Sequence, residues 1–146
     1  MTDMIIMSCS MTKKHLENVP ALELYDGHAY RVIRKRRTEN LEILIISAKY
    51  GPIRSTDIVS YYDQVMTVAG AVEMRDHVED AIRHVIRGHS PGRIFISLGF
   101  PYNLTISDGL LRFLDENYNV QVASGAIGKR LHQLKEWLES LKEVPG

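Results

Sequence analysis

Two short segments of this chain place hydroxyl, ammonium and aromatic side chains directly after runs of apolar residues. The first run, Met4–Met7, leads into Ser8–Lys14, and the second, Leu41–Ile46, leads into Ser47–Pro52. Apolar runs of this length, rich in isoleucine and bounded by turn residues, are typical of buried strands in a parallel sheet. Because ligands of open α/β sheets bind beyond the carboxyl ends of such strands, the two polar segments indicate a binding site.

The first segment, Ser8–Lys14, has the groups that contact an anion. The hydroxyls of Ser8 and Ser10 and the ammonium group of Lys13 lie next to the backbone N–H groups of a strand-to-loop turn. Such groups can cradle a phosphate or contact a sugar, although the glycine spacing of a Walker loop is absent. The alternative is a polar turn with solvated lysines. Cys9 is interpreted as a small buried hydrophobe rather than a nucleophile.

The second segment is the sharper signal. Gly51 and Pro52 force a turn straight after the strand, which places Lys49 and Tyr50 at the edge of the sheet. Lysine offers charge for a phosphate or a developing anion, and tyrosine offers a ring face and a hydroxyl. We predict catalytic roles for Lys49 and Tyr50 and substrate binding for Ser47. The alternative is an ordinary strand end, with Tyr50 covering the core.

Tyr62 and Asp63 follow in the long segment between Tyr50 and Gly70. An aromatic ring and a carboxylate outside regular structure suit base stacking beside a general base or a group that stabilises an oxocarbenium ion. We predict that Asp63 is the catalytic carboxylate and that Tyr62 binds substrate. The alternative is that Tyr61 and Tyr62 anchor the loop to the core.

Tyr25 and Asp26 precede the first expected helix. The favoured interpretation of Asp26 is the N-cap of that helix. The functional alternative makes Tyr25 a stacking platform and Asp26 a polar contact in the same cleft.

Two further segments with basic residues each allow a functional and a structural interpretation. Gly125 and Lys129 lie in a strand-to-helix turn that favours an anion, although tight packing explains the glycine equally well. The basic stretch Arg31–Arg37 can follow a phosphate backbone or form a solvated helix face that nearby glutamates partly neutralise.

Composition excludes several classes of protein. The formal net charge is +0, so any contact with nucleic acid must come from a local patch. The single cysteine cannot form an internal disulfide, which favours a cytoplasmic location, and the beginning of the chain lacks the pattern of a signal peptide. No apolar run has the length of a membrane span, and the six histidines form no recognised ligand motif. We therefore expect no membrane association, no metal and no cofactor.

The pattern along the chain predicts alternating strands and helices. The expected strands are Met4–Met7, Leu41–Ser47, Arg93–Leu98 and Val120–Ala123. The expected helices are His28–Arg37, Ala71–Arg87, with Gly88 as its stop signal, Ser107–Asn117, with Ser107 as its N-cap, and Ile127–Leu141.

Alternation of this kind predicts a three-layer α/β/α sandwich around a mainly parallel four-stranded sheet. We expect residues 1–146 to form a single α/β domain with a flexible tail at residues 143–146. The segment from Tyr50 to Gly70 is too long for an ordinary βα loop, and Asp57–Met66 is interpreted as a short helix or an irregular lid.

Taken together, the motifs resemble a family of small uncharacterised bacterial, archaeal and phage domains. The matching stretches are Ser8–Lys13, Leu24–Tyr25, Ser47–Gly51, Tyr62–Asp63 and Gly125–Lys135. That family looks related to the YaaA peroxide-stress proteins and to the accessory domain of archaeosine synthases, and both are similar to the uracil-DNA-glycosylase type of α/β/α fold. The resemblance implies a role on nucleic acid or nucleobases. The chain has neither the Gly-Gln-Asp-Pro-Tyr nor the His-Pro-Ser-Pro motif of uracil-DNA glycosylases, so uracil specificity is not implied.

Three hypotheses of function follow from these residues. The first is an enzyme that cleaves the N-glycosidic bond of a modified base in DNA or RNA, with Asp63 stabilising the sugar cation and Lys13 and Lys49 holding phosphate. The second is a non-catalytic module that binds nucleic acid or nucleotides. The third is a hydrolase of free nucleosides or nucleotides, over which the Tyr50–Gly70 segment closes.

Overall fold

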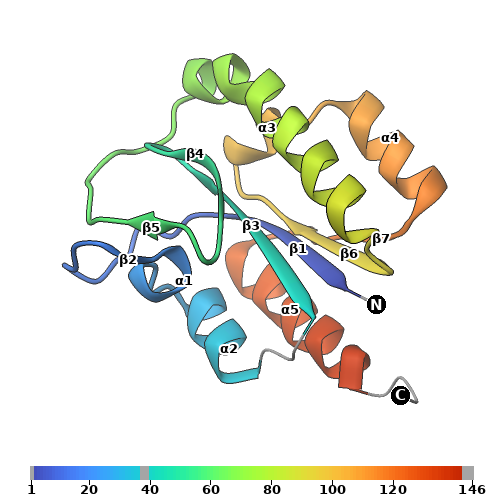
Figure 1. The fold of residues 1–146 in the computed structure, drawn as a ribbon, viewed down its shortest axis with the longest axis horizontal. Helices are drawn as coiled ribbons and strands as arrows, with labels where there is room; N and C mark the ends of the chain where they lie inside the picture. The colour runs from blue at the N-terminus through green and yellow to red at the C-terminus, as the bar shows by residue number, and fades with distance from the viewer. Residues whose placement is uncertain (1, 37–39, 143–146) are drawn as a thin grey trace.

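A twisted five-stranded sheet forms the centre of the molecule, in the order β4-β3-β1-β6-β7 (Figure 1). The computed structural model describes residues 2–36 and 40–142, so the tail expected at residues 143–146 and the position of Arg37 lie outside the described residues. The strands are β1 Asp3–Ser8, β3 Leu41–Ser47, β4 Gly51–Arg54, β6 Arg93–Ser97 and β7 Asn119–Val122. β3, β1, β6 and β7 are parallel to one another, whereas β4 pairs antiparallel with β3.

Helices cover both faces of the sheet, as the three-layer prediction requires (Figure 1). One face carries α1 Ala21–Leu24, α2 His28–Arg36 and α5 Ile127–Lys142, and the other carries α3 Val68–His89 and α4 Asp108–Asn117. Successive side chains of a strand point to opposite faces. Ile5 and Met7 of β1 therefore pack in the core under α2 and α5, and Met4 and Ile6 pack in the core under α3 and α4.

The expected count of four strands is wrong, because the chain turns back after β3 and adds β4 at the edge of the sheet. Gly51 makes the reversal with a φ of 73°, and Pro52 pairs opposite Ile46. Gly51 and Pro52 indicate only a turn in the sequence, since proline disfavours a strand interior. β4 tolerates Pro52 because an edge strand leaves one side of its backbone unpaired.

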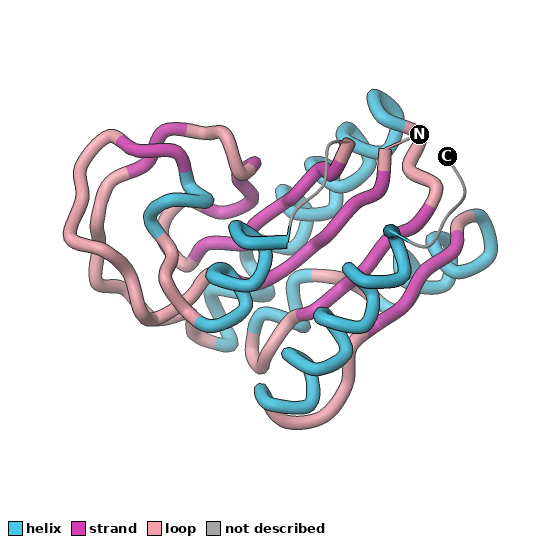
Figure 2. Tube along the Cα trace, turned by 90° about the horizontal axis from the view of Figure 1, so that it is seen from below, coloured by secondary structure: helices cyan, strands magenta, loops and turns pink. Residues whose placement is uncertain are grey.

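The segment Asp57–Met66 contains no helix, so that part of the prediction is wrong. It holds instead the short strand β5, Ile58–Val59, which pairs antiparallel with β2, Val19–Pro20. Figure 2 shows these loops gathered at one end of the sheet, opposite the end where β1 begins. The two long loops thus hold each other at the carboxyl edge, meaning the edge where the parallel strands end.

The helix predictions are confirmed apart from their ends. α3 begins at Val68 rather than Ala71, because the side chain of Thr67 caps it by accepting from the Gly70 N–H. Gly88 lies inside α3, which ends at His89 and is capped by Ser90 in a left-handed conformation with a φ of 45°. Ser107 caps α4 by accepting from the Leu110 N–H, as predicted. None of the described helices is long and apolar enough to cross a membrane.

Candidate functional site

The polar ends of β1 and β3 lie side by side at the carboxyl edge. Ser8, the last residue of β1, pairs with Ile46, the residue before Ser47 in β3. The hydroxyl of Tyr30 in α2 donates to the Ser8 carbonyl at 2.7 Å. The parallel register therefore brings the two predicted segments together, as the sequence indicates.

A chain of buried hydroxyl groups runs from the end of β3 into the loop segments. Ser47 Oγ lies 2.8 Å from the hydroxyl of Tyr62, which lies 2.9 Å from the hydroxyl of Tyr25. Ser47 Oγ also accepts from the backbone N–H groups of Lys49 and Tyr50, at 3.2 and 3.0 Å. Because those two bonds occupy its lone pairs, the Ser47 proton is the one that is donated to Tyr62.

Burial keeps the phenol groups of Tyr25 and Tyr62 protonated. It raises the pKa of Tyr25 to about 12. Burial and the neighbouring Cys9 sulfur raise the pKa of Tyr62 well above its usual value. Both hydroxyls are therefore uncharged hydrogen-bonding groups at neutral pH and not general bases. Tyr25 is fully buried and Tyr62 is 6% exposed, so a base could stack on either ring only after the loops moved.

Cys9 has a polar neighbour that the sequence does not reveal. Its Sγ lies 3.1 Å from the hydroxyl of Tyr102, which belongs to the 3-10 helix η1, Tyr102–Thr105. The thiol is half-buried against the core under α2 and α5. Burial and Cys9 raise the pKa of Tyr102 far above its usual value, so Tyr102 is a neutral partner. No sequence signal pairs these two residues, which lie 93 positions apart.

Two ammonium groups lie over the tyrosine rings of this edge. Lys13 Nζ is 4.5 Å from the ring centroid of Tyr62, and Lys49 Nζ is 5.2 Å from that of Tyr50. The two rings meet edge to face, with 5.5 Å between their centroids. Among the described residues, neither lysine forms an ion pair. The site therefore presents positive charge that lacks an internal counter-ion, which is what an anionic ligand needs.

Asp63 directly follows Tyr62 in the sequence and is exposed. In the described parts of the chain its carboxylate forms no hydrogen bond or ion pair. The Gln64 side chain donates to the Ala48 carbonyl at 3.0 Å, and the Tyr50 hydroxyl donates to the Ser60 carbonyl at 3.1 Å. These bonds hold the loop that carries Asp63 against the turn after β3.

Asp26 serves α2 differently from the predicted N-cap. Its carboxylate accepts from Arg31 and Arg34, with shortest distances of 3.0 and 2.6 Å. The hydrogen bond from Arg31, followed by that from Arg34, lowers the pKa of Asp26 to about 2. α2 begins at His28, so Gly27 is the residue directly before the helix. The Gly27 carbonyl accepts from the Arg31 N–H. Asp26 therefore lies one residue too early to cap α2, so the capping prediction is wrong, and its carboxylate pairs with the two guanidinium groups instead.

Much of the basic stretch in α2 is neutralised by nearby carboxylates. Arg31 and Arg34 pair with Asp26, and Arg36 pairs with Glu139 of α5 at 2.7 Å. Arg34 also donates to two backbone carbonyls of the α1 region. The described arginines of this stretch thus fasten α2 to its neighbours.

The remaining predicted residues lie near the lysines or at the other side of the sheet. The Ser10 hydroxyl donates to the Thr12 carbonyl at 2.8 Å, within the segment that carries Lys13. Gly125 has a φ of 90°, and a Cβ there would lie 3.0 Å from the Lys129 side chain. Both follow β7, which is the edge strand farthest from β3 and β4, so the structure does not bring them into the lysine group.

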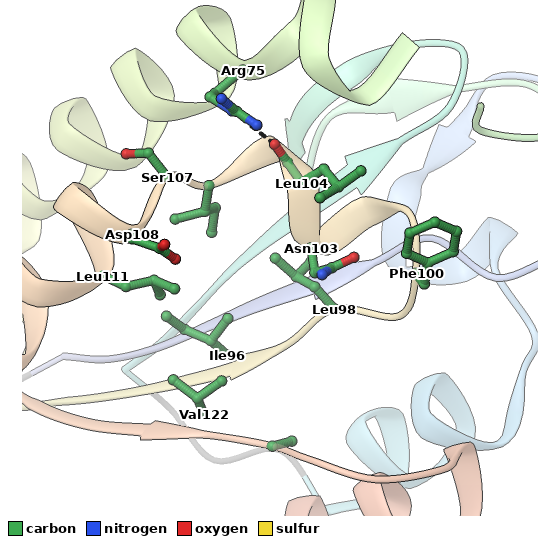
Figure 3. A pocket seen from close by; sticks show the side chains of 12 residues that line it. Arg75, Ile96, Leu98, Phe100, Asn103, Leu104, Ser107, Asp108, Leu111 and Val122 are labelled. Carbon is green, nitrogen blue, oxygen red and sulfur yellow. Dashed lines mark hydrogen bonds between the residues drawn. The ribbon is translucent and has the colours of Figure 1, made fainter. Parts of the chain in front are cut away.

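A pocket of about 560 Å³ opens at the ends of β6 and β7, beneath η1 and α4 (Figure 3). None of the catalytic or binding residues predicted from the sequence lines it, although Ser107, which is predicted as an N-cap, does. Arg75 of α3 holds its roof by donating to the Leu104 carbonyl at 2.8 Å. Sequence reasoning misses this pocket because the segment after β6, Leu98–Pro101, carries no charged or hydroxyl side chain.

Comparison with a solved structure shows the fold alone. The crystal structure of AF0587, a protein of unknown function, superposes with a TM-score of 0.55 at 14% sequence identity. The alignment covers 99% of this chain and 46% of that one, so the chain spans less than half the length of that protein. No curated protein matches the chain. The family of unknown function DUF6884 matches residues 4–136, and the chain belongs to that family.

Proposed function

We propose that the protein binds a nucleotide, free or within a nucleic acid, at the carboxyl edge and cleaves the N-glycosidic bond of a modified base. The observation that carries this proposal is the position of Lys13 and Lys49 over Tyr62 and Tyr50, without carboxylate partners among the described residues. A phosphate would supply the missing counter-charge, and the half-buried ring of Tyr50 would offer a face to a base or sugar.

In the proposed reaction a water molecule attacks C1′ of the sugar while the C1′–N bond breaks. The water oxygen becomes the hydroxyl at C1′, and the electron pair of the broken bond leaves with the base. The other water proton reaches the departing base by way of the Asp63 carboxylate. The negative charge of Asp63 stabilises the positive charge that develops on the sugar, as carboxylates do in glycoside hydrolysis.

The resemblance to YaaA proteins and to the archaeosine-synthase accessory domain supports a nucleobase role, and a uracil-DNA-glycosylase-like fold is part of the same proposal. The α/β sheet with helices on both faces agrees with that fold at a coarse level. The lysines lie where open α/β sheets bind ligands, which also supports the proposal.

Mass-spectrometric detection of released free bases tests the reaction. The substrates are modified phage DNA, cellular DNA and bulk tRNA. We expect the unaltered protein to release a base and Asp63→Asn to release none while binding the same polymer. Asp80→Asn, which changes an exposed carboxylate of α3, is the matched control and should keep the activity. Base release by Asp63→Asn at the unaltered rate would refute the assignment of Asp63.

One observation favours a second function, a non-catalytic nucleic-acid-binding module. Asp63 is exposed, and among the described residues Ser47 and Thr105 are the buried polar ones, so no carboxylate is fully enclosed at this edge. A module of this kind would show binding that weakens steeply with salt and yields no product. Removing the charges of Lys13 and Lys49 should reduce the salt dependence of binding. Removing the charge of Arg36, which pairs with Glu139, should have little effect on it.

A further inference from the structure

We propose that the pocket beneath η1 and α4 binds the heteroaromatic base of the nucleotide, while Lys13 and Lys49 hold its phosphate. This inference rests on the proposed function and assigns the base to a site that is separate from the tyrosine rings. The pocket lies at the same carboxyl edge as the lysines, at the ends of the neighbouring strands β6 and β7.

The size and floor of the pocket suit a flat ring. Its volume of about 560 Å³ lies within the range of small-molecule sites, about 300–1,000 Å³, and has room for a nucleoside. Ile96, Leu98 and Val122 form an apolar floor, and Leu111 of α4 adds an apolar wall (Figure 3). Phe100 lies at one end with its side chain 75% exposed, which leaves an aromatic face for stacking.

Four polar residues line the pocket, and two of them, Asn103 and Asp108, have side chains that are open to a ligand. Asn103 offers both a donor and an acceptor through its amide, and Asp108 offers carboxylate oxygens. Within the described residues neither side chain forms a hydrogen bond. A heteroaromatic base has apolar faces and carries donors and acceptors around its edge, so it complements both the floor and these two groups.

η1 joins the pocket to the lysine side of the edge. Tyr102 and Asn103 are consecutive in η1, and the first contacts Cys9 at 3.1 Å while the second lines the pocket. Cys9 belongs to the segment Ser8–Lys14, which also carries Lys13. A base in the pocket would therefore have its sugar and phosphate directed across η1 toward the cations.

Nuclear magnetic resonance titration of the ¹⁵N-labelled protein tests the inference with two kinds of probe. The first is each unphosphorylated nucleoside in turn: adenosine, guanosine, cytidine and uridine. The second is inorganic phosphate. We expect at least one nucleoside to shift the amides of Leu98, Asn103 and Val122, and phosphate to shift those near Lys13 and Lys49.

Val122→Trp fills the pocket and should weaken nucleoside binding by about tenfold or more. Val72→Trp on α3 is the matched control, because Val72 is 48% exposed and Val122 is 53% exposed. Asn103→Ala should weaken binding by about fivefold, the loss of one hydrogen bond.

The outcomes separate this inference from the proposed function. Absence of nucleoside shifts in the pocket, or equal affinity of Val122→Trp and the unaltered protein, overturns the pocket assignment even if bases are released. Nucleoside binding in the pocket, together with no phosphate binding and no base release, supports the pocket and refutes the proposed function.

Discussion

Replacing Tyr62 by phenylalanine removes one oxygen atom from the middle of the buried hydroxyl chain. That oxygen bonds to Ser47 at 2.8 Å and to Tyr25 at 2.9 Å. Each bond contributes about 1 kcal/mol, so Tyr62→Phe should lower the free energy of unfolding by about 2 kcal/mol. The buried hydroxyls of Ser47 and Tyr25 each lose a partner and have no access to water, so the loss of unfolding free energy should not fall below about 2 kcal/mol.

The expected fall in melting temperature follows from the chain length. At about 2.1 cal/mol/K per residue, the unfolding entropy of 146 residues is about 0.3 kcal/mol/K. A loss of about 2 kcal/mol therefore lowers Tm by about 7 °C. Differential scanning calorimetry measures this shift, and urea denaturation gives the free energy independently.

Tyr61→Phe is the matched control for this prediction. The neighbouring ring of Tyr61 stacks on His15 with 4.1 Å between centroids, and its hydroxyl makes no hydrogen bond within the described residues. Its removal should change Tm by less than about 2 °C. Equal melting temperatures for the Tyr62 and Tyr61 variants would refute the hydroxyl chain as a source of stability.

The other predictions concern charge and pH. Lys13→Gln and Lys49→Gln should each weaken phosphate binding by about tenfold or more in a calorimetric titration, whereas Lys14→Gln should not; equal affinities would contradict the anion site. The arginine partners lower the pKa of Asp26 from 3.8 to about 2, so its stabilising effect is present above pH 3.8 and is lost as the pH falls toward 2; Asp26→Asn should flatten that part of the acid unfolding curve. Burial raises the pKa of Tyr25 from 10.0 to about 12, so stability present below pH 10.0 is lost as the pH rises toward 12; Tyr25→Phe should show a smaller loss by alkaline urea denaturation, and an unchanged loss would contradict this.

The central elements could be predicted from the sequence because their signals are local. The isoleucine-rich runs of β1 and β3 are buried on both faces, and short runs of this kind are typical of strands inside a covered parallel sheet. α4 was located by its apolar period and by Ser107, whose capping bond spans only three residues. The two polar segments after the strands meet because parallel strands end at a common edge.

The tertiary structure decided the features that depend on distant partners. β4 exists because Pro52 lies at an edge of the sheet, and a proline in isolation indicates only a turn. The position of Asp26 before a helix predicts a cap, but in the folded chain its carboxylate pairs with two arginine side chains. The turn that Gly51 and Pro52 predict is present, and only the strand after it was missed, whereas the cap predicted for Asp26 is wrong.

Some residues of the candidate site could likewise be predicted from the sequence, whereas other features of the site depend on the tertiary structure. Residue type and position directly after a strand are enough to predict Lys13 and Lys49 from the sequence, whereas Asp63 is predicted from its type and its place beside Tyr62 in the long segment between Tyr50 and Gly70. The contact of Cys9 with Tyr102 and the pocket beneath η1 depend on how β6, η1 and α4 pack together. The sequence of an apolar segment does not indicate whether the segment lines a pocket. A pocket is defined by surfaces that come from separate elements, so only the folded chain determines where it lies.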